Sequence, residues 1–236
     1  MKFALVNDLR QEAASQLKGI CIGCGNPVVA KCGEQRIHHW AHKAKIQCDP
    51  WWENETEWHR SWKNQFPTDW QEIVHIADNG EKHIADVKTQ DGWIIEFQHS
   101  YIKPEERRVR ENFYKKLIWV VDGLRRSTDM TRIMSVVENS GPNNFWPELR
   151  VIFAEGAIFR DWITSTVPVI YDFGVDDLWC LFPQSNELWA YILPIPRVEF
   201  TQRLGSNNLS PFDDVIRKFN SFLAQYKSPR HLVQGL

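Results

Sequence analysis

Two acidic residues and an amide lie in the segment IADVKTQDGWIIEFQ, residues 84–98, at spacings that could bind a metal ion. Two short runs rich in β-branched residues flank Asp91-Gly92, a strong tight-turn pair, so the segment predicts a β-hairpin. Because side chains alternate faces along a strand, Glu96 and Gln98 share one face, and Asp86 approaches Glu96 from the partner strand. The hairpin therefore predicts two converging carboxylates.

A divalent cation would explain why two carboxylates are held so close. Like charges repel, and burying them costs free energy unless a cation neutralises them. Hard oxygen ligands favour Mg²⁺ or Mn²⁺. Such an ion can polarise a water and hold a phosphate, while Gln98 orients the water or the phosphate. We therefore expect phosphodiester hydrolysis, although the solvated face of a sheet can show the same residue pattern.

A predicted helix precedes the hairpin and carries further polar groups. Glu55, His59 and Lys63 are spaced four residues apart in NETEWHRSWKNQF and would line one stripe of that helix. An ordinary charged surface opposite Trp58 and Trp62 would give the same spacing. Because the hairpin that carries Asp86 and Glu96 follows directly, the stripe supports a catalytic site rather than an ordinary surface.

The N-terminal fifth of the chain holds a second group of residues with metal-binding potential. Cys21-x2-Cys24 is followed by His39-x2-His42 and Cys48, with PVVAKC and QRIHHW predicting a hairpin between the two halves. Structural zinc takes four Cys or His ligands in a tetrahedron, so five candidates compete for four positions. Buried reduced thiols or a redox pair are the alternatives.

The hairpin and its surroundings resemble a known family. ENETEWHRSWK, IADVKTQDGWIIEFQHS, a helix with Arg110 and Tyr114, and LIWVVDG together resemble the nuclease core of the competence protein CoiA-like family, over residues 19–123. That family is similar to the PD-(D/E)XK nuclease superfamily, whose restriction-endonuclease-like core is a mixed sheet in the order αβββαβ. The resemblance implies Asp86 and Glu96 as metal ligands and Glu55 as a helix-borne carboxylate.

The same resemblance bears on Gln98 and on the zinc ligands. Gln98 stands where the superfamily usually has lysine. A lysine ammonium can stabilise developing negative charge, whereas a neutral amide can only hydrogen-bond. The metal would therefore have to supply more of the lowering of the activation barrier. HHWAHKAKIQC resembles the family's HFAH segment and its following cysteine. This favours Cys21, Cys24, His42 and Cys48 as the zinc ligands. His39 is the main rival candidate.

Composition limits the class of protein. The 236 residues are 43% hydrophobic and 25% charged, with no apolar run near the roughly 18 residues that span a bilayer. Four of the five cysteines precede residue 49, which does not resemble a disulfide framework. We therefore expect a cytoplasmic enzyme without membrane contact. A net charge of −2 leaves nucleic-acid binding to local groups, for which we predict His59, Lys63, Arg110 and Tyr114.

The expected fold class is α/β, as an α+β mixed sheet in three parts. Residues 1–50 hold a strand, an amphipathic segment and the zinc-binding hairpin, and residues 51–139 form the nuclease core. The core should contain a strand near 72–77, a helix over 104–116, a buried strand over 117–123 and a helix over 125–138. NSGPNNFWP, residues 139–147, marks a break. Residues 148–236 predict a β-rich, aromatic extension ending in a helix over 212–226.

These expectations combine into a Mg²⁺- or Mn²⁺-dependent deoxyribonuclease with a structural zinc module. The resemblance implies a role in DNA uptake or recombination, and the same core suits repair or defence against foreign DNA. One alternative is a catalytically inactive zinc-containing adaptor that binds nucleic acid. A second is a subunit of a larger DNA-processing complex, or a homodimer, which uses the aromatic C-terminal part as its interface.

Overall fold

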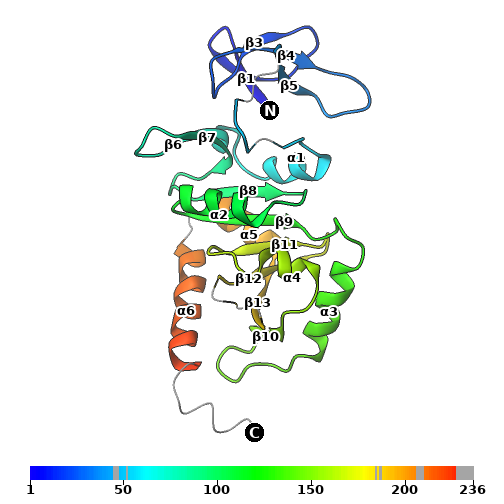
Figure 1. The fold of residues 1–236 in the computed structure, drawn as a ribbon, viewed down its shortest axis with the longest axis vertical. Helices are drawn as coiled ribbons and strands as arrows, with labels where there is room; N and C mark the ends of the chain where they lie inside the picture. Colours follow the sequence, from blue (N-terminus) through cyan, green and yellow to red (C-terminus); the bar gives the residue numbers. More distant parts are fainter. Residues whose placement is uncertain (45–47, 52, 184, 186–187, 206–209, 227–236) are drawn as a thin grey trace.

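The computed structural model describes residues 1–44, 48–51, 53–183, 185, 188–205 and 210–226. These residues form a small N-terminal sheet and a larger mixed sheet, which follow one another along the long axis of the molecule (Figure 1). The predicted mixed α and β fold class is confirmed.

The small sheet is antiparallel and contains the predicted zinc hairpin. Its strands are β1 (Phe3–Val6), β2 (Leu9–Glu12), β3 (Lys18–Ile20), β4 (Pro27–Lys31) and β5 (His39–His42), in the order β2-β1-β3-β4-β5. β4 and β5 pair as predicted, with Ala30 opposite Trp40. The segment predicted to be amphipathic begins instead with strand β2. Asn7 and Asp8, with φ of 51° and 62°, close a tight β1–β2 turn of the kind that asparagine and aspartate favour.

The first half of the large sheet follows the order αβββαβ that the resemblance implies. It comprises α1 (Glu57–Lys63), a short 3₁₀ helix (Thr68–Trp70), β6 (Gln71–Ile76), β7 (Lys82–Lys88), β8 (Ile94–Gln98), α2 (Pro104–Phe113) and β9 (Leu117–Asp122). The predicted turn between β7 and β8 is present, with Gly92 at φ 80° and its N–H donating to Thr89 O. β9 is buried along its whole length, as its continuous apolar run predicts.

The second half extends the same sheet. It comprises α3 (Asp129–Asn139), β10 (Arg150–Phe153), α4 (Ala157–Trp162), β11 (Val169–Asp172), β12 (Asp177–Leu181), β13 (Trp189–Pro196), α5 (Arg197–Gly205) and α6 (Ser210–Tyr226). Helices α4 and α5 are additional to the predicted elements. The strand order is β10-β13-β12-β11-β9-β8-β7-β6, with β9 parallel to both β8 and β11. The sheet thus continues across the break predicted at residues 139–147, and residues 227–236 of the predicted extension lie outside the described part.

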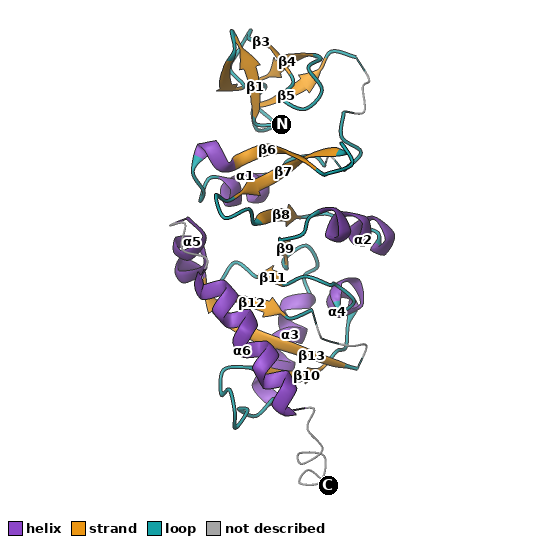
Figure 2. Ribbon diagram, turned by 90° about the vertical axis from the view of Figure 1, so that its left-hand side faces the viewer, coloured by secondary structure: helices purple, strands orange, loops and turns teal. Residues whose placement is uncertain are grey.

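Helices cover both faces of the large sheet (Figure 2). One hydrophobic cluster joins Trp62 of α1, Phe200 of α5 and Phe219 of α6 to β8, β9 and β11. The other joins the opposite sheet face to α2, α3 and α4, with Trp162 of α4 among its buried members. Burial on both faces explains the apolar runs of the central strands. Among the described residues, no helix is long and apolar enough to cross a membrane.

Candidate active site and zinc cluster

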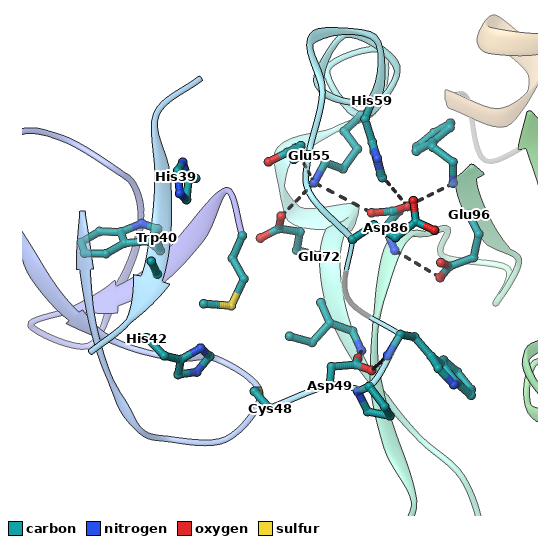
Figure 3. A pocket seen from close by; sticks show the side chains of 18 of the residues that line it. His39, Trp40, His42, Cys48, Asp49, Glu55, His59, Glu72, Asp86 and Glu96 are labelled. Carbon is teal, nitrogen blue, oxygen red and sulfur yellow. Dashed lines mark hydrogen bonds and ion pairs between the residues drawn. The ribbon is translucent and has the colours of Figure 1, made fainter. Parts of the chain in front are cut away.

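A cavity of about 530 Å³ lies between the small sheet and the large one (Figure 3). Strand β5 and residues 48–51 line it from the side of the small sheet. From the large sheet it is lined by residues around α1 and by β6, β7 and β8. All four predicted catalytic residues line this cavity: Asp86 on β7, Glu96 and Gln98 on β8, and Glu55.

The predicted convergence of Asp86 and Glu96 is confirmed. In the β7–β8 ladder Val87 pairs with Ile95, and the two acids lie directly beside that pair, Asp86 before Val87 and Glu96 after Ile95. Beyond that pair the main chains separate, and Phe97 N donates to Asp86 Oδ2 at 3.0 Å. Asp86 N donates to Glu96 Oε1 at 3.4 Å. The two carboxylates therefore open the ladder and face the same cavity.

The two carboxylates differ in their neutralising partners. Although burial opposes its ionisation, His59 Nε2 at 2.8 Å and Lys63 Nζ at 3.9 Å hold the pKa of Asp86 below its ordinary value. Burial and the Asp86 charge raise the pKa of Glu96 well above its ordinary value, with Arg110 Nη1 at 3.8 Å from its carboxylate. Glu96 is thus a buried acid whose charge the neighbouring side chains do not fully neutralise.

These surroundings fit a hard divalent cation. Asp86 Oδ1 and Glu96 Oε2 accept no hydrogen bond from the described residues, so each carboxylate keeps an oxygen for a metal. The Tyr114 hydroxyl and Arg110 Nε are buried, and no described group is their hydrogen-bond partner. A metal with its water shell would supply positive charge and hydrogen-bonding groups.

The raised pKa of Glu96 would make the binding of a cation here dependent on pH. Because a cation and a proton compete for this carboxylate, apparent Mn²⁺ affinity should rise on the order of tenfold per pH unit below the pKa of Glu96. Isothermal titration between pH 5.5 and pH 8.5 measures the slope. Glu96→Gln should weaken binding and flatten the slope. A wild-type affinity independent of pH would contradict this assignment.

Helix α1 begins later than the resemblance implies, and Glu55 lies just before it. Thr56 is the N-cap, and its Oγ1 accepts from His59 N at 3.2 Å. His59 and Lys63 share the predicted stripe. Glu55 still faces it, because its carboxylate binds Lys63 Nζ at 2.6 Å and Arg60 through both oxygens. Glu55 is therefore a carboxylate held against the helix rather than on it.

Lys63 occupies the centre of a buried ion cluster. Its side chain is 3% exposed, and its ammonium lies 2.6 Å from Glu55 and 2.8 Å from Glu72. Glu72, on β6, was not among the sequence candidates. Its other contacts come from the N-terminal strand, since Lys2 N and Phe3 N donate to its two oxygens at 2.6 and 3.0 Å. This cluster joins the small sheet to the wall of the cavity.

The other predicted nucleic-acid contacts are also buried in the described structure. Arg110 is 4% exposed, donates to Trp51 O and binds Glu106. Tyr114 is 1% exposed, and burial raises the pKa of its hydroxyl. Gln98 is 1% exposed, and its amide donates to Glu53 and to Ser100. Arg110 and Gln98 line the cavity, whereas Tyr114 packs against Trp51 and Phe113.

Four of the five zinc candidates come together. Ligand atoms of Cys21, Cys24, His42 and Cys48 all lie within 4.8 Å of one another. The Sγ atoms of Cys21 and Cys48 are 3.6 Å apart, and Cys24 Sγ lies 3.3 Å from His42 Nε2. These separations suit a tetrahedral ion with Zn–S bonds of about 2.3 Å.

The thiol chemistry agrees with metal binding. Although burial opposes ionisation, hydrogen bonds from Asn26, Cys48 and His42 lower the pKa of Cys24 to about 6, so it is a thiolate at neutral pH. His39 stands outside the cluster and lines the cavity, with Nδ1 donating to Ile37 O at 2.9 Å. The Cys₃His set could bind zinc, as predicted.

Asp49 links this cluster to the β7–β8 hairpin. It directly follows Cys48, and its carboxylate accepts from His83 Nδ1 and from Ile84 N on β7, both at 2.8 Å. Lys82 Nζ also donates to Gly23 O inside the Cys-x2-Cys turn at 2.7 Å. No local sequence pattern indicates these contacts, apart from the proximity of Asp49 to a cysteine. The zinc turn is thus anchored on the strand that carries Asp86.

The fold and the cluster define a class of protein: a mixed α/β core that carries an N-terminal Cys₃His module. Residues 6–50 match the family model described as competence protein CoiA, N-terminal domain. This match supports the resemblance to the CoiA-like family that the sequence indicates. The match covers strands β2 to β5 and the cysteine cluster, and ends before α1. No curated protein and no solved structure matches the chain.

Proposed function

We propose that this protein is a metal-dependent nuclease that hydrolyses phosphodiester bonds in DNA, with a PD-(D/E)XK-like core of the ExQ type. The observation that carries the proposal is the pair of buried carboxylates, Asp86 and Glu96, which converge in one cavity where Arg110 Nη1 comes no closer than 3.8 Å to Glu96. The order of elements from α1 to β9 supports it. The CoiA match supports a competence-related role, such as DNA uptake or recombination.

In this proposal Mg²⁺ or Mn²⁺ binds Asp86 and Glu96, and supplies a polarised water and charge stabilisation for the phosphate. His59 holds the Asp86 carboxylate in place through its 2.8 Å contact. Gln98 is fixed by Glu53 and Ser100 at the end of β8 and lines the cavity, where its amide can orient water or phosphate. Zinc in the Cys₃His cluster would hold the module that closes the cavity.

The test is cleavage of labelled DNA by wild type and by Asp86→Asn, with Mg²⁺, Mn²⁺ or EDTA. Changing a residue that only hydrogen-bonds to a metal ligand lowers metal affinity or activity roughly 10–100-fold. Removing a ligand itself should therefore lower the cleavage rate by more than about 100-fold. Asp78→Asn is the matched control, because that carboxylate is 98% exposed on the β6–β7 turn. The zinc content and circular dichroism of Asp86→Asn should equal those of wild type. Equal cleavage by wild type and Asp86→Asn would contradict the proposal.

One observation favours the alternative of an inactive adaptor. The chain has Gln98 in the place usually held by lysine, and the nearest ammonium, on Lys63, is bound by Glu55 and Glu72. Tight DNA binding without cleavage in any metal would support that function. We also propose a reducing, cytoplasmic location, since all five cysteines are free and three belong to the cluster.

We also propose that the protein binds a partner protein or a second copy of itself. Phe145 and Phe153, near the β10 edge of the sheet, are 47% and 44% exposed. Light scattering on the purified protein distinguishes a monomer from a homodimer.

A further inference from the structure

We infer that the substrate of this site is an unpaired DNA strand, which crosses the molecule between the small sheet and the large one. This inference rests on the proposed nuclease function and names its substrate class. The features that carry it are the enclosure of the carboxylates, the anchoring of the small sheet over them, and a second cavity that continues the first.

The acids lie inside the molecule rather than on an open surface. The side chains of Asp86 and Glu96 are 17% and 8% exposed. The cavity that contains them, about 530 Å³, has the size of pockets that hold small molecules. A duplex presents its backbone on the outside of a stiff rod whose major groove alone is about 12 Å wide. A scissile phosphate can reach these acids only if its own nucleotide enters the cavity, and an already unpaired strand does so without the free-energy cost of drawing a nucleotide out of a duplex.

The small sheet is fixed in place over this cavity. Figure 3 shows Trp40 and His42 of β5 on one side of the cavity and Asp86 and Glu96 on the other. Two separate groups of contacts hold the sheets together. At one end Glu72 accepts from Lys2 N and Phe3 N, and at the other Asp49 binds His83. Opening the cavity to admit a duplex would break both groups.

A second cavity provides a path for the rest of the strand. It measures about 360 Å³ and shares Met1, His39 and Glu55 with the first. Its other lining residues come from the β4–β5 loop and from the segment before α1: Gln35, Arg36, Ile37, Asn54, Thr56 and Glu57. Arg36 is exposed there and can bind a phosphate. His39 lies where the two cavities meet, with its ring oriented by Ile37 O.

Aromatic side chains in the first cavity suit unpaired bases. Trp51 lines it and is held by stacking on His83, with ring centroids 3.3 Å apart. Base stacking on aromatic rings contributes about 1–3 kcal/mol per base to single-strand binding. A paired base cannot stack in this way because its faces are covered by neighbouring pairs.

The test compares two DNA molecules that differ in pairing. One is a linear oligo-dT of 30 nucleotides, and the other is a covalently closed dumbbell duplex with minimal loops. Binding is measured by fluorescence anisotropy with Ca²⁺, and cleavage is measured on gels with Mn²⁺. We expect wild type to bind oligo-dT at least about tenfold more tightly than the dumbbell, and to cut only the unpaired DNA.

A variant tests the path itself. Arg36→Ala should weaken oligo-dT binding several-fold and reduce the slope of log K against log salt by about 0.7, the value for one phosphate contact on a single strand. Arg160→Ala is the matched control, since that arginine is exposed on α4 and lines neither cavity. An unchanged salt slope for Arg36→Ala would overturn the path through the second cavity.

The outcomes separate this inference from the proposed function. Equal binding or cutting of the dumbbell and oligo-dT would overturn the unpaired-strand substrate while leaving the nuclease in place. Preference for oligo-dT in binding, without cutting in Mn²⁺, would support the unpaired strand as ligand and overturn the nuclease. Absence of binding to either DNA would overturn the inference.

Discussion

Replacing Lys63 with methionine is expected to lower the free energy of unfolding by about 3–5 kcal/mol, the cost of removing one partner from a buried ion pair. The substitution keeps most of the side-chain volume but leaves Glu55 and Glu72 without their common ammonium. Both carboxylates lie within 2.8 Å of it, and all three side chains are at most 7% exposed. Urea denaturation at pH 7 measures the loss.

The pH dependence of this effect has a defined sign. Burial alone would raise the pKa of Glu72, but Lys63 and the chain's N-terminal amine hold it far below its ordinary value. Its contribution is therefore complete above the unfolded carboxyl pKa of about 4.3 and is lost as the pH falls. Burial opposes the charge of Lys63, yet Glu72, Asp86 and Glu55 raise its pKa. That contribution is complete below about pH 10.4 and is lost as the pH rises.

The stabilising effect of Lys63 should therefore be largest between roughly pH 5 and pH 10. Lys115→Met is the matched control, since Lys115 pairs with Asp78 at a surface where their side chains are 87% and 98% exposed. That exposed pair should contribute nothing measurable. If Lys63→Met and Lys115→Met unfolded at the same urea concentration, the buried cluster would not have the assigned role.

Removing zinc should have the second large effect, because the small sheet has only a small hydrophobic core of its own. The buried members of its hydrophobic cluster are Met1, Ala4, Ala13, Cys21, Val28 and Trp40. Units of this size usually need a metal or disulfides to fold. Structural zinc contributes an apparent 10–16 kcal/mol or so in small zinc-binding peptides.

Wild type should therefore contain one zinc per chain by elemental analysis, and Cys21→Ser should lose it. Loss of zinc should release Asp49 and the strand β5 wall, so amide exchange should accelerate across residues 3–42 while β9 stays protected. Cys32→Ser is the matched control, since Cys32 lies outside the four-residue cluster. Retention of full zinc by Cys21→Ser would refute the assigned ligand set.

Local patterns predicted the catalytic hairpin and the zinc cluster. Asp91-Gly92 determines the turn, and strand alternation then places Asp86 and Glu96 together. Two histidines and three cysteines at close spacing left five candidates for four positions, with His39 as the main rival of the favoured set. Only the β4–β5 register, which sets Val28 opposite His42 and Lys31 opposite His39, places His42 beside the Cys-x2-Cys turn. Register depends on pairing between strands, which spacing alone does not give.

Burial and long-range contacts were beyond local patterns. Lys63 and Arg110 look like exposed basic groups in the sequence, yet tertiary packing surrounds both with carboxylates. Asp49 meets His83 across 34 residues, and Glu72 meets Lys2 across 70. A helical period identifies which residues share a face, but not which charged partners other segments bring to that face.

The parallel pairing of β9 with both β8 and β11 also constrains the order in which the chain can fold. Val120 lies opposite Phe97 on one side and Ile170 on the other, so β9 needs a partner 50 residues later in the chain. During synthesis, a nascent chain that has emerged only to Asn139 carries β9 with one edge unpaired and one apolar face uncovered. Such strand edges recruit other chains, and contacts so distant in sequence form slowly. The half of the sheet that carries Asp86 and Glu96 can thus be completed only after the C-terminal half has been made.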